Sequence, residues 1–72
     1  MPKVPSISSR ACIDALARLG FSVVRQQGSH ISLKNDQGRL VVVPYRKELP
    51  KGTLRAILKQ AGIPLEDFLE AL

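Results

Sequence analysis

Residues 21–43 read FSVVRQQGSHISLKNDQGRLVVV and carry the clearest indication of the fold. Three short runs rich in Val, Ile and Leu, at 21–26, 30–34 and 39–43, are separated by polar turns that contain glycine. Runs of this kind are typical of β-strands. The connections of three and four residues are too short for a crossover, so the runs are predicted to form an antiparallel meander.

The second run predicts how the sheet is oriented. Ile31 and Leu33 point to one side of a strand, because side chains alternate along it. His30, Ser32 and Lys34 then point to the other side. One face of the sheet is therefore expected to be apolar and covered, and the opposite face to be polar, basic and open to solvent.

A helix is predicted before the meander. Ser8 or Ser9 can cap its start, and Gly20 is a natural stop. Its apolar residues follow helical spacing and are Cys12, Ala15, Leu16 and Leu19. Cys12 is interpreted as a small core residue with an unactivated thiol. Residues 1–7, which contain two prolines, are expected to form a loose leader.

Two further helices are predicted after the meander. The first ends at Gly62, and its apolar stripe consists of Leu54, Ile57, Leu58 and Ala61. Pro64 opens a short last helix with Glu66 and Asp67 in its first turn, where the helix dipole favours acids. The order is α-β-β-β-α plus a short C-terminal helix. Amphipathic helices on one face of a three-stranded antiparallel sheet predict a single α+β domain over residues 1–72.

The charge is unevenly distributed. The chain has eleven Lys and Arg against six Asp and Glu, but residues 1–63 carry eleven positive and three negative charges, a net charge of +8. Such an excess in a small domain favours a polyanionic partner, either nucleic acid or an acidic protein surface. The three aromatic residues are too few for a stacking platform of the kind that reads single-stranded RNA.

Cysteine content and hydropathy set further bounds. A single cysteine rules out an internal disulfide and a four-cysteine zinc site, and a reducing compartment such as the cytoplasm is the simplest context. The longest aliphatic run, at 40–43, ends at a proline, so no membrane span is expected. No metal-ligand spacing occurs, and neither a metal nor another cofactor is predicted.

His30 is the only histidine of the chain and the first candidate for catalysis. An unperturbed histidine, with a pKa of about 6.5, can take and give protons near neutral pH. The alternative interpretation is an ordinary surface histidine, because no second ligand or nucleophile stands at a motif spacing.

Five short strings occur together in one order. They are Leu19-Gly20-Phe21, Gly28-Ser29-His30, Val43-Pro44, Glu48-Leu49 and GTLRAILKQAGI at 52–63. At these spacings the chain resembles the HicA toxin family, also called YcfA-like, from about Ser8 to Leu72. The chain departs from the family pattern at one point, because it lacks the second histidine that members often carry after Val-Pro.

The resemblance implies a fold like the double-stranded-RNA-binding domain and an mRNA-cleaving toxin, or mRNA interferase, that a HicB antitoxin holds inactive. It places the family's catalytic histidine on His30, and Gly28 and Ser29 at the positions that shape the motif. From the residues alone, Gly28 either adopts a positive φ in a turn or allows RNA to approach closely. Ser29 either binds a phosphate or caps the turn.

RNA can be cut without metal when its own 2′-OH attacks the adjacent phosphorus. His30 would then act as general base or general acid, and Lys34, Arg39 or Arg46 would stabilise the developing charge. The second proton would pass through water, Tyr45 or a lysine.

The basic side chains have two interpretations. Arg25, Lys34, Arg39 and Arg46 either line an RNA path or are solvated surface charge. If they bind RNA without cleavage, the chain is a non-catalytic module for double-stranded or structured RNA. A third interpretation is a protein-interaction element that docks an acidic partner.

Overall fold

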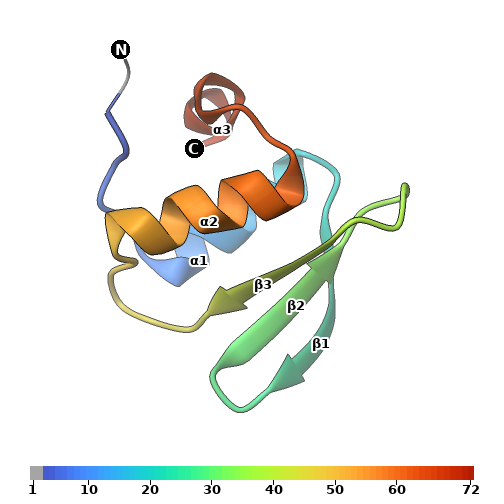
Figure 1. The fold of residues 1–72 in the computed structure, drawn as a ribbon. Coiled ribbons are helices and arrows are strands. Elements are labelled where there is room, and N and C mark those ends of the chain that lie inside the picture. The colour runs from blue at the N-terminus through green and yellow to red at the C-terminus, as the bar shows by residue number, and fades with distance from the viewer. Residues whose placement is uncertain (1–2) are drawn as a thin grey trace.

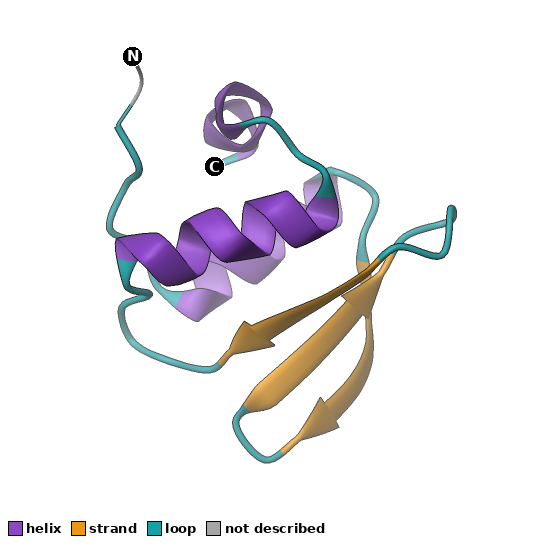
Figure 2. Ribbon diagram, in the orientation of Figure 1, coloured by secondary structure: helices purple, strands orange, loops and turns teal. Residues whose placement is uncertain are grey.

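The computed structural model describes residues 3–72 and confirms the predicted α+β fold. The elements are α1 (Ser9–Arg18), β1 (Ser22–Gln27), β2 (His30–Lys34), β3 (Leu40–Pro44), α2 (Lys51–Ala61) and α3 (Leu65–Ala71). The sheet has the order β1-β2-β3, and both pairs of strands are antiparallel. Helices cover one side of this sheet, and α3 lies beyond them as a short final helix (Figures 1 and 2).

The core forms where the helices meet the covered side of the sheet. Ile31 and Leu33 are buried, as the alternation predicted, and Val41 and Val43 of β3 join them. The apolar stripes of α1 and α2 meet these side chains, which places both helices over the same face. Burial of this apolar surface is the main stabilising term of the fold.

The first hairpin turn contains Gly28 and Ser29 and connects β1 to β2. Gln27 pairs with His30 across it, so the loop has two residues. Gly28 has a φ of 59°, and no non-glycine residue among residues 3–72 has a positive φ. A positive φ at the first central residue alone is the pattern of a type II′ turn, whose twist matches the flanking strands. The turn-forming interpretation of Gly28 is therefore correct.

The second hairpin turn is closed by Asn35. Its carbonyl accepts the amide of Gly38 at 3.0 Å, and its side-chain oxygen accepts the amides of Gln37 at 3.1 Å and Arg39 at 2.8 Å. Gly38 has a φ of 80°. A turn followed by a left-handed glycine forms a bulge that fixes the register of the next strand.

The N-terminal segment corrects one prediction. Residues 3–7 have no regular secondary structure, but they are not a loose leader, because Val4 is only 5% exposed and packs into the core. The Ile7 carbonyl accepts the Leu49 amide at 2.7 Å, and the Ser6 hydroxyl donates to the Glu48 carboxylate. The two prolines remove backbone donors, but they do not prevent side-chain burial. Residues 1–2 of the predicted leader lie outside the described residues.

The strand boundaries differ from the prediction by one residue. Phe21 precedes β1 rather than starting it, and is buried below the end of α1, where its amide donates to the Leu16 carbonyl at 3.0 Å. Pro44 ends β3, although proline was expected to follow it. Proline is tolerated there because β3 is an edge strand.

Replacing Gly62 and Gly52 with alanine is expected to have opposite effects on the free energy of unfolding. Gly62 ends α2 with a φ of 70°, and a Cβ there would lie 3.1 Å from the Arg39 guanidinium, so Gly62→Ala is expected to lower the free energy of unfolding by about 1–2 kcal/mol. Gly52 lies within α2 with nothing within 4 Å of an added Cβ, so Gly52→Ala should raise it by about 0.5–1 kcal/mol. Urea denaturation of both variants checks this, and equal effects would contradict it.

Candidate active site

The side of the sheet away from the helices is called here the open face. Cross-strand neighbours in an antiparallel sheet point to the same side, so the register defines its residues. They form three rows: Gln27, His30 and Pro44; Arg25, Ser32 and Val42; Ser22, Lys34 and Leu40. Figure 1 shows that no helix covers this side.

His30 is exposed at one end of the open face. It is the first residue of β2, opposite Gln27 of β1 and Pro44 of β3, so it lies where the type II′ turn meets the end of β3. The Tyr45 amide donates to the Ser29 carbonyl at 2.6 Å and extends the strand pairing by one step. The Gly28-Ser29-His30 string and Tyr45 are thus held together at this end.

Arg25 and Lys34 lie on the open face with His30. The Arg25 row is one step along the sheet from the His30 row, about 7 Å away, and the Lys34 row is two steps, about 13 Å away, at 3.3 Å per residue. A long arginine side chain can cover the shorter separation. An extended polyanion on this face would meet His30 and Arg25 together and Lys34 further along.

Arg39 lies on the other side of the sheet, which corrects the prediction that it lines the same path. Its Nη1 donates to the Gln60 carbonyl at 3.1 Å, and its guanidinium packs against Gly62. A cation at the C-terminal end of α2 donates to a carbonyl that has no partner within the helix, and its interaction with the helix dipole is favourable. The alternation of β3 carried this signal, since Val41 and Val43 face the core and Arg39 has the same parity.

Arg46 is fixed near the His30 end through its backbone. Its amide donates to the Ser9 Oγ at 2.9 Å, and its carbonyl accepts the Ser9 amide at 3.0 Å and the Ser9 hydroxyl at 2.8 Å. The Arg46 side chain remains exposed, two residues after Pro44. The sequence allowed either serine to cap α1. In the structure Ser8 is the cap, accepting the Ala11 amide at 3.1 Å, and Ser9 holds the segment that carries Arg46.

The open face is less polar than predicted. Its β2 residues are polar or basic, but β3 contributes Leu40, which is 53% exposed, and Val42, which is 37% exposed. The prediction rested on β2 alone, and the valine-rich β3 has apolar side chains on both faces. The open face therefore has a basic part, on β1 and β2, and an apolar part on β3.

Cys12 is buried in the core, as predicted, and burial raises the pKa of its thiol to about 11 from 9.0. At pH 8 this leaves about a hundredfold less thiolate than a thiol of pKa 9 would have. We expect the folded chain to react very slowly with a disulfide reagent at pH 8, and the chain in urea to react at once. Fast reaction of the folded chain would contradict the burial.

The sign of the Cys12 shift also sets a pH dependence. Because the pKa of the thiol is higher in the folded chain, the folded state binds the proton more tightly, so its stabilisation is present below pH 9 and is lost as pH rises towards 11. Cys12 is thus a structural residue without the depressed pKa of a nucleophile.

Two further features of residues 3–72 bear on the site. No three or more His, Cys, Asp and Glu side chains in this part of the chain are arranged so that they could hold a metal ion. No helix within the same residues is long and apolar enough to cross a membrane.

The chain is thus a small basic α+β protein of the double-stranded-RNA-binding-domain type, with one exposed histidine at the end of an open sheet face. A family model described as "HicA toxin of bacterial toxin-antitoxin" matches residues 9–63. The chain belongs to the HicA toxin family.

A solved structure supports this membership. The chain is similar to a chain of a "Toxin-Antitoxin complex from Streptococcus pneumoniae", with 31% sequence identity and a TM-score of 0.71. The likeness covers 79% of this chain and 98% of the other. A search of curated proteins gives no match.

Proposed function

We propose that this chain is the toxin of a toxin-antitoxin pair and acts as a metal-independent endoribonuclease that cleaves mRNA in the cytoplasm. A HicB-like antitoxin is its partner and inhibitor. The observation that carries the proposal is the placement of His30, exposed on the open face and held at a defined end of the sheet by the Gly28 turn. Membership of a toxin family supports the toxin role.

The proposed reaction is an internal transfer at phosphorus. The 2′-oxygen of a ribose bonds to the adjacent phosphorus, the bond from phosphorus to the 5′-oxygen breaks, and a 2′,3′-cyclic phosphate remains on one fragment. One group removes the 2′-OH proton and another supplies a proton to the 5′-oxygen. His30 performs one of these transfers, as general base when neutral or as general acid when protonated.

Neighbouring groups have defined parts in this proposal. Arg25, one row from His30 on the open face, and Arg46, two residues after Pro44, stabilise the negative charge that develops on the phosphorane oxygens. The second proton passes through water, a lysine or Tyr45, whose backbone amide the Ser29 carbonyl accepts at the same end. Gly28 and Ser29 shape the turn that positions His30.

The basic part of the open face predicts a salt dependence of RNA binding. Each phosphate contact with a single strand contributes a slope of about −0.7 to the logarithmic salt plot. Arg25→Ala and Lys34→Ala are each expected to flatten the slope by about that amount. Arg39→Ala is the matched control, since its side chain is on the covered side and is bonded to Gln60. If all three variants flatten the salt slope equally, the RNA does not bind on the open face.

The activity is tested by incubating the purified chain with a long single-stranded RNA in excess EDTA. Fragments are expected, and adding a HicB-like antitoxin in stoichiometric amount should stop their appearance. The antitoxin is proposed to act by covering His30 and by placing negative charge over the open face. RNA that stays intact after long incubation with a high concentration of the chain would count against the nuclease.

The second candidate function is binding of double-stranded or structured RNA without cleavage. It is favoured by the double-stranded-RNA-binding-domain type of fold and by a single histidine with no second one beside it. Retarded RNA that remains intact, with the same affinity for the His30→Ala variant, would select this function.

A further inference from the structure

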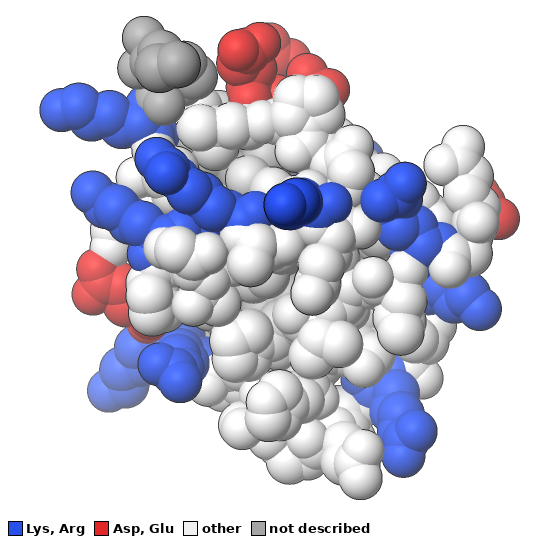
Figure 3. All heavy atoms as spheres, viewed as in Figure 1, with Lys and Arg blue, Asp and Glu red and all other residues white. Residues whose placement is uncertain are grey.

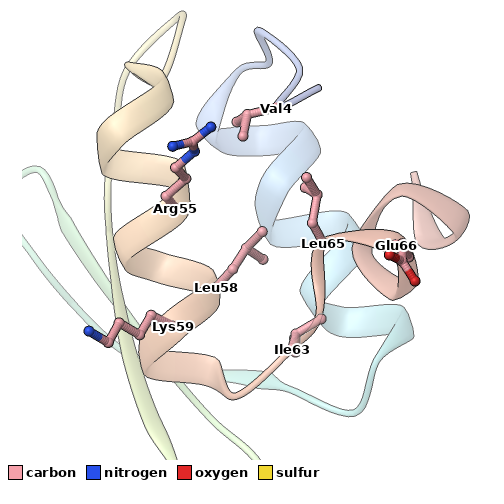
Figure 4. A pocket seen from close by; sticks show the side chains of 7 residues that line it. All are labelled: Val4, Arg55, Leu58, Lys59, Ile63, Leu65 and Glu66. Carbon is pink, nitrogen blue, oxygen red and sulfur yellow. The ribbon is translucent and has the colours of Figure 1, made fainter. Parts of the chain in front are cut away.

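A groove lies in the helical layer, on the opposite side of the sheet from the open face. It has a volume of about 450 Å³ and opens between α2, the segment that joins α2 to α3, and the N-terminal segment (Figure 4). Val4 and Leu58 form a buried apolar floor, and Leu65 adds a half-buried apolar wall. None of these residues lies on the open face.

The rim of the groove along α2 is cationic. Arg55 and Lys59 are exposed, one helical turn apart, and both line the groove. Lys51 continues the row one turn earlier, at a rise of about 6 Å per four residues. α2 contains no acidic residue, and the one carboxylate that lines the groove, Glu66, lies on α3 across from this rim (Figure 4). Figure 3 shows the row of Lys and Arg side chains across the face that α2 presents to solvent.

We propose that this groove docks an acidic, amphipathic segment of the antitoxin. Apolar side chains of that segment would occupy the floor over Val4 and Leu58, and its carboxylates would pair with Arg55 and Lys59. The inference rests on the proposed function for the existence of the antitoxin. It adds a second contact, separate from the one that covers His30.

The chemistry of the lining favours a protein segment over RNA. Phosphates would use the cations but would gain nothing from an apolar floor, and no lining residue is aromatic, so no base could stack there. A peptide with apolar and acidic residues on adjacent sides uses both features at once. Its apolar contacts supply affinity, and the charge pairs set its orientation.

Two separated contacts have a consequence for neutralisation. An antitoxin held at the groove keeps its inhibitory part at a high effective concentration near the open face. Weakening the groove contact should therefore lower affinity without removing inhibition at saturation. That pattern distinguishes a docking site from the inhibitory site.

The test uses a HicB-family protein that restores growth when it is expressed with this chain. Its dissociation constant is measured by calorimetry, at one salt concentration, for the unchanged chain and for Arg55→Glu and Lys59→Glu. Arg10→Glu is the matched control, because Arg10 is exposed on α1 and does not line the groove. Circular dichroism and methyl NMR establish that each variant is folded.

We expect each groove variant to bind at least tenfold more weakly, and the Arg10 variant to change by less than threefold. The methyl signals of Ile63 and Leu65 should shift when the antitoxin binds. RNA cleavage by the groove variants should equal that of the unchanged chain and be fully inhibited at saturation.

Several outcomes would overturn the inference. Equal losses of antitoxin affinity in all three variants would mean that the effect comes from overall charge. Unchanged affinity in the groove variants would mean that the antitoxin does not bind in the groove. A tenfold loss of RNA affinity in the groove variants would assign the groove to RNA, and a change in self-association by light scattering would assign it to a second copy. If no HicB-family protein binds the unchanged chain, the proposal that a HicB-like antitoxin is the partner is wrong, and the docking site for it is wrong as a consequence.

Discussion

Replacing His30 with alanine is expected to lower the rate of RNA cleavage by about 10²–10⁴-fold, the usual effect of losing a positioned general acid or base. The side chain is exposed and has no role in the core, so the fold should be retained. The rate is measured under single-turnover conditions with a 5′-labelled RNA. RNA affinity, determined separately, should change little, because Arg25 and Lys34 remain.

Gln27→Ala is the matched control for this prediction. Gln27 pairs with His30 across the turn and shares its side of the sheet, but it carries no titratable group. We expect its cleavage rate to stay within about threefold of the parent rate, far less than the loss expected for a catalytic group. Parent activity in His30→Ala, or an equal loss in both variants, would remove His30 from its catalytic role.

The second large effect is expected in the core, for Phe68→Ala. Phe68 is fully buried and is the only buried residue of α3, a helix of seven residues. Phenylalanine-to-alanine changes in a core cost about 3–5 kcal/mol. A chain of 72 residues has a total stability of roughly 4–11 kcal/mol, so this change removes much of it. Urea denaturation at 25 °C measures the loss.

Leu72→Ala provides the comparison for Phe68→Ala. Leu72 is 48% exposed beyond the end of α3, and its replacement should cost less than about 1 kcal/mol. A similar small cost for Phe68→Ala would mean that α3 contributes little to the core.

Most of the fold was predictable because its signals are local. The apolar residues of α1, which include Leu16, and those of α2, which include Leu58, recur at helical spacing. Ile31 and Leu33 alternate with polar residues along β2. The types of these elements and the covered face of the sheet follow directly from these patterns. The short turns that contain glycine allow neighbouring strands to pair only in the antiparallel sense, because parallel strands need a longer crossover connection. The burial of Val4 was not predictable, because it depends on the groove that α2 and α3 form around it and not on its own neighbours in the sequence.

The candidate site was predictable in part. The place of His30 follows from the glycine turn and the start of a strand, and its exposure follows from the alternation of β2. Arg39 was misplaced because its charge was considered without the parity of β3. The bonds between Ser9 and Arg46 join residues 37 positions apart, and no local pattern indicates a contact of that range.

The most direct measurement identifies the ends of RNA fragments made by the parent chain and by His30→Ala in excess EDTA. We expect the parent to leave 2′,3′-cyclic phosphate or 3′-phosphate ends together with 5′-hydroxyl ends, and the variant to leave the RNA intact. This pair of results would establish 2′-OH attack that depends on His30. Fragments with 3′-hydroxyl and 5′-phosphate ends, or cleavage that persists in the variant, would contradict it.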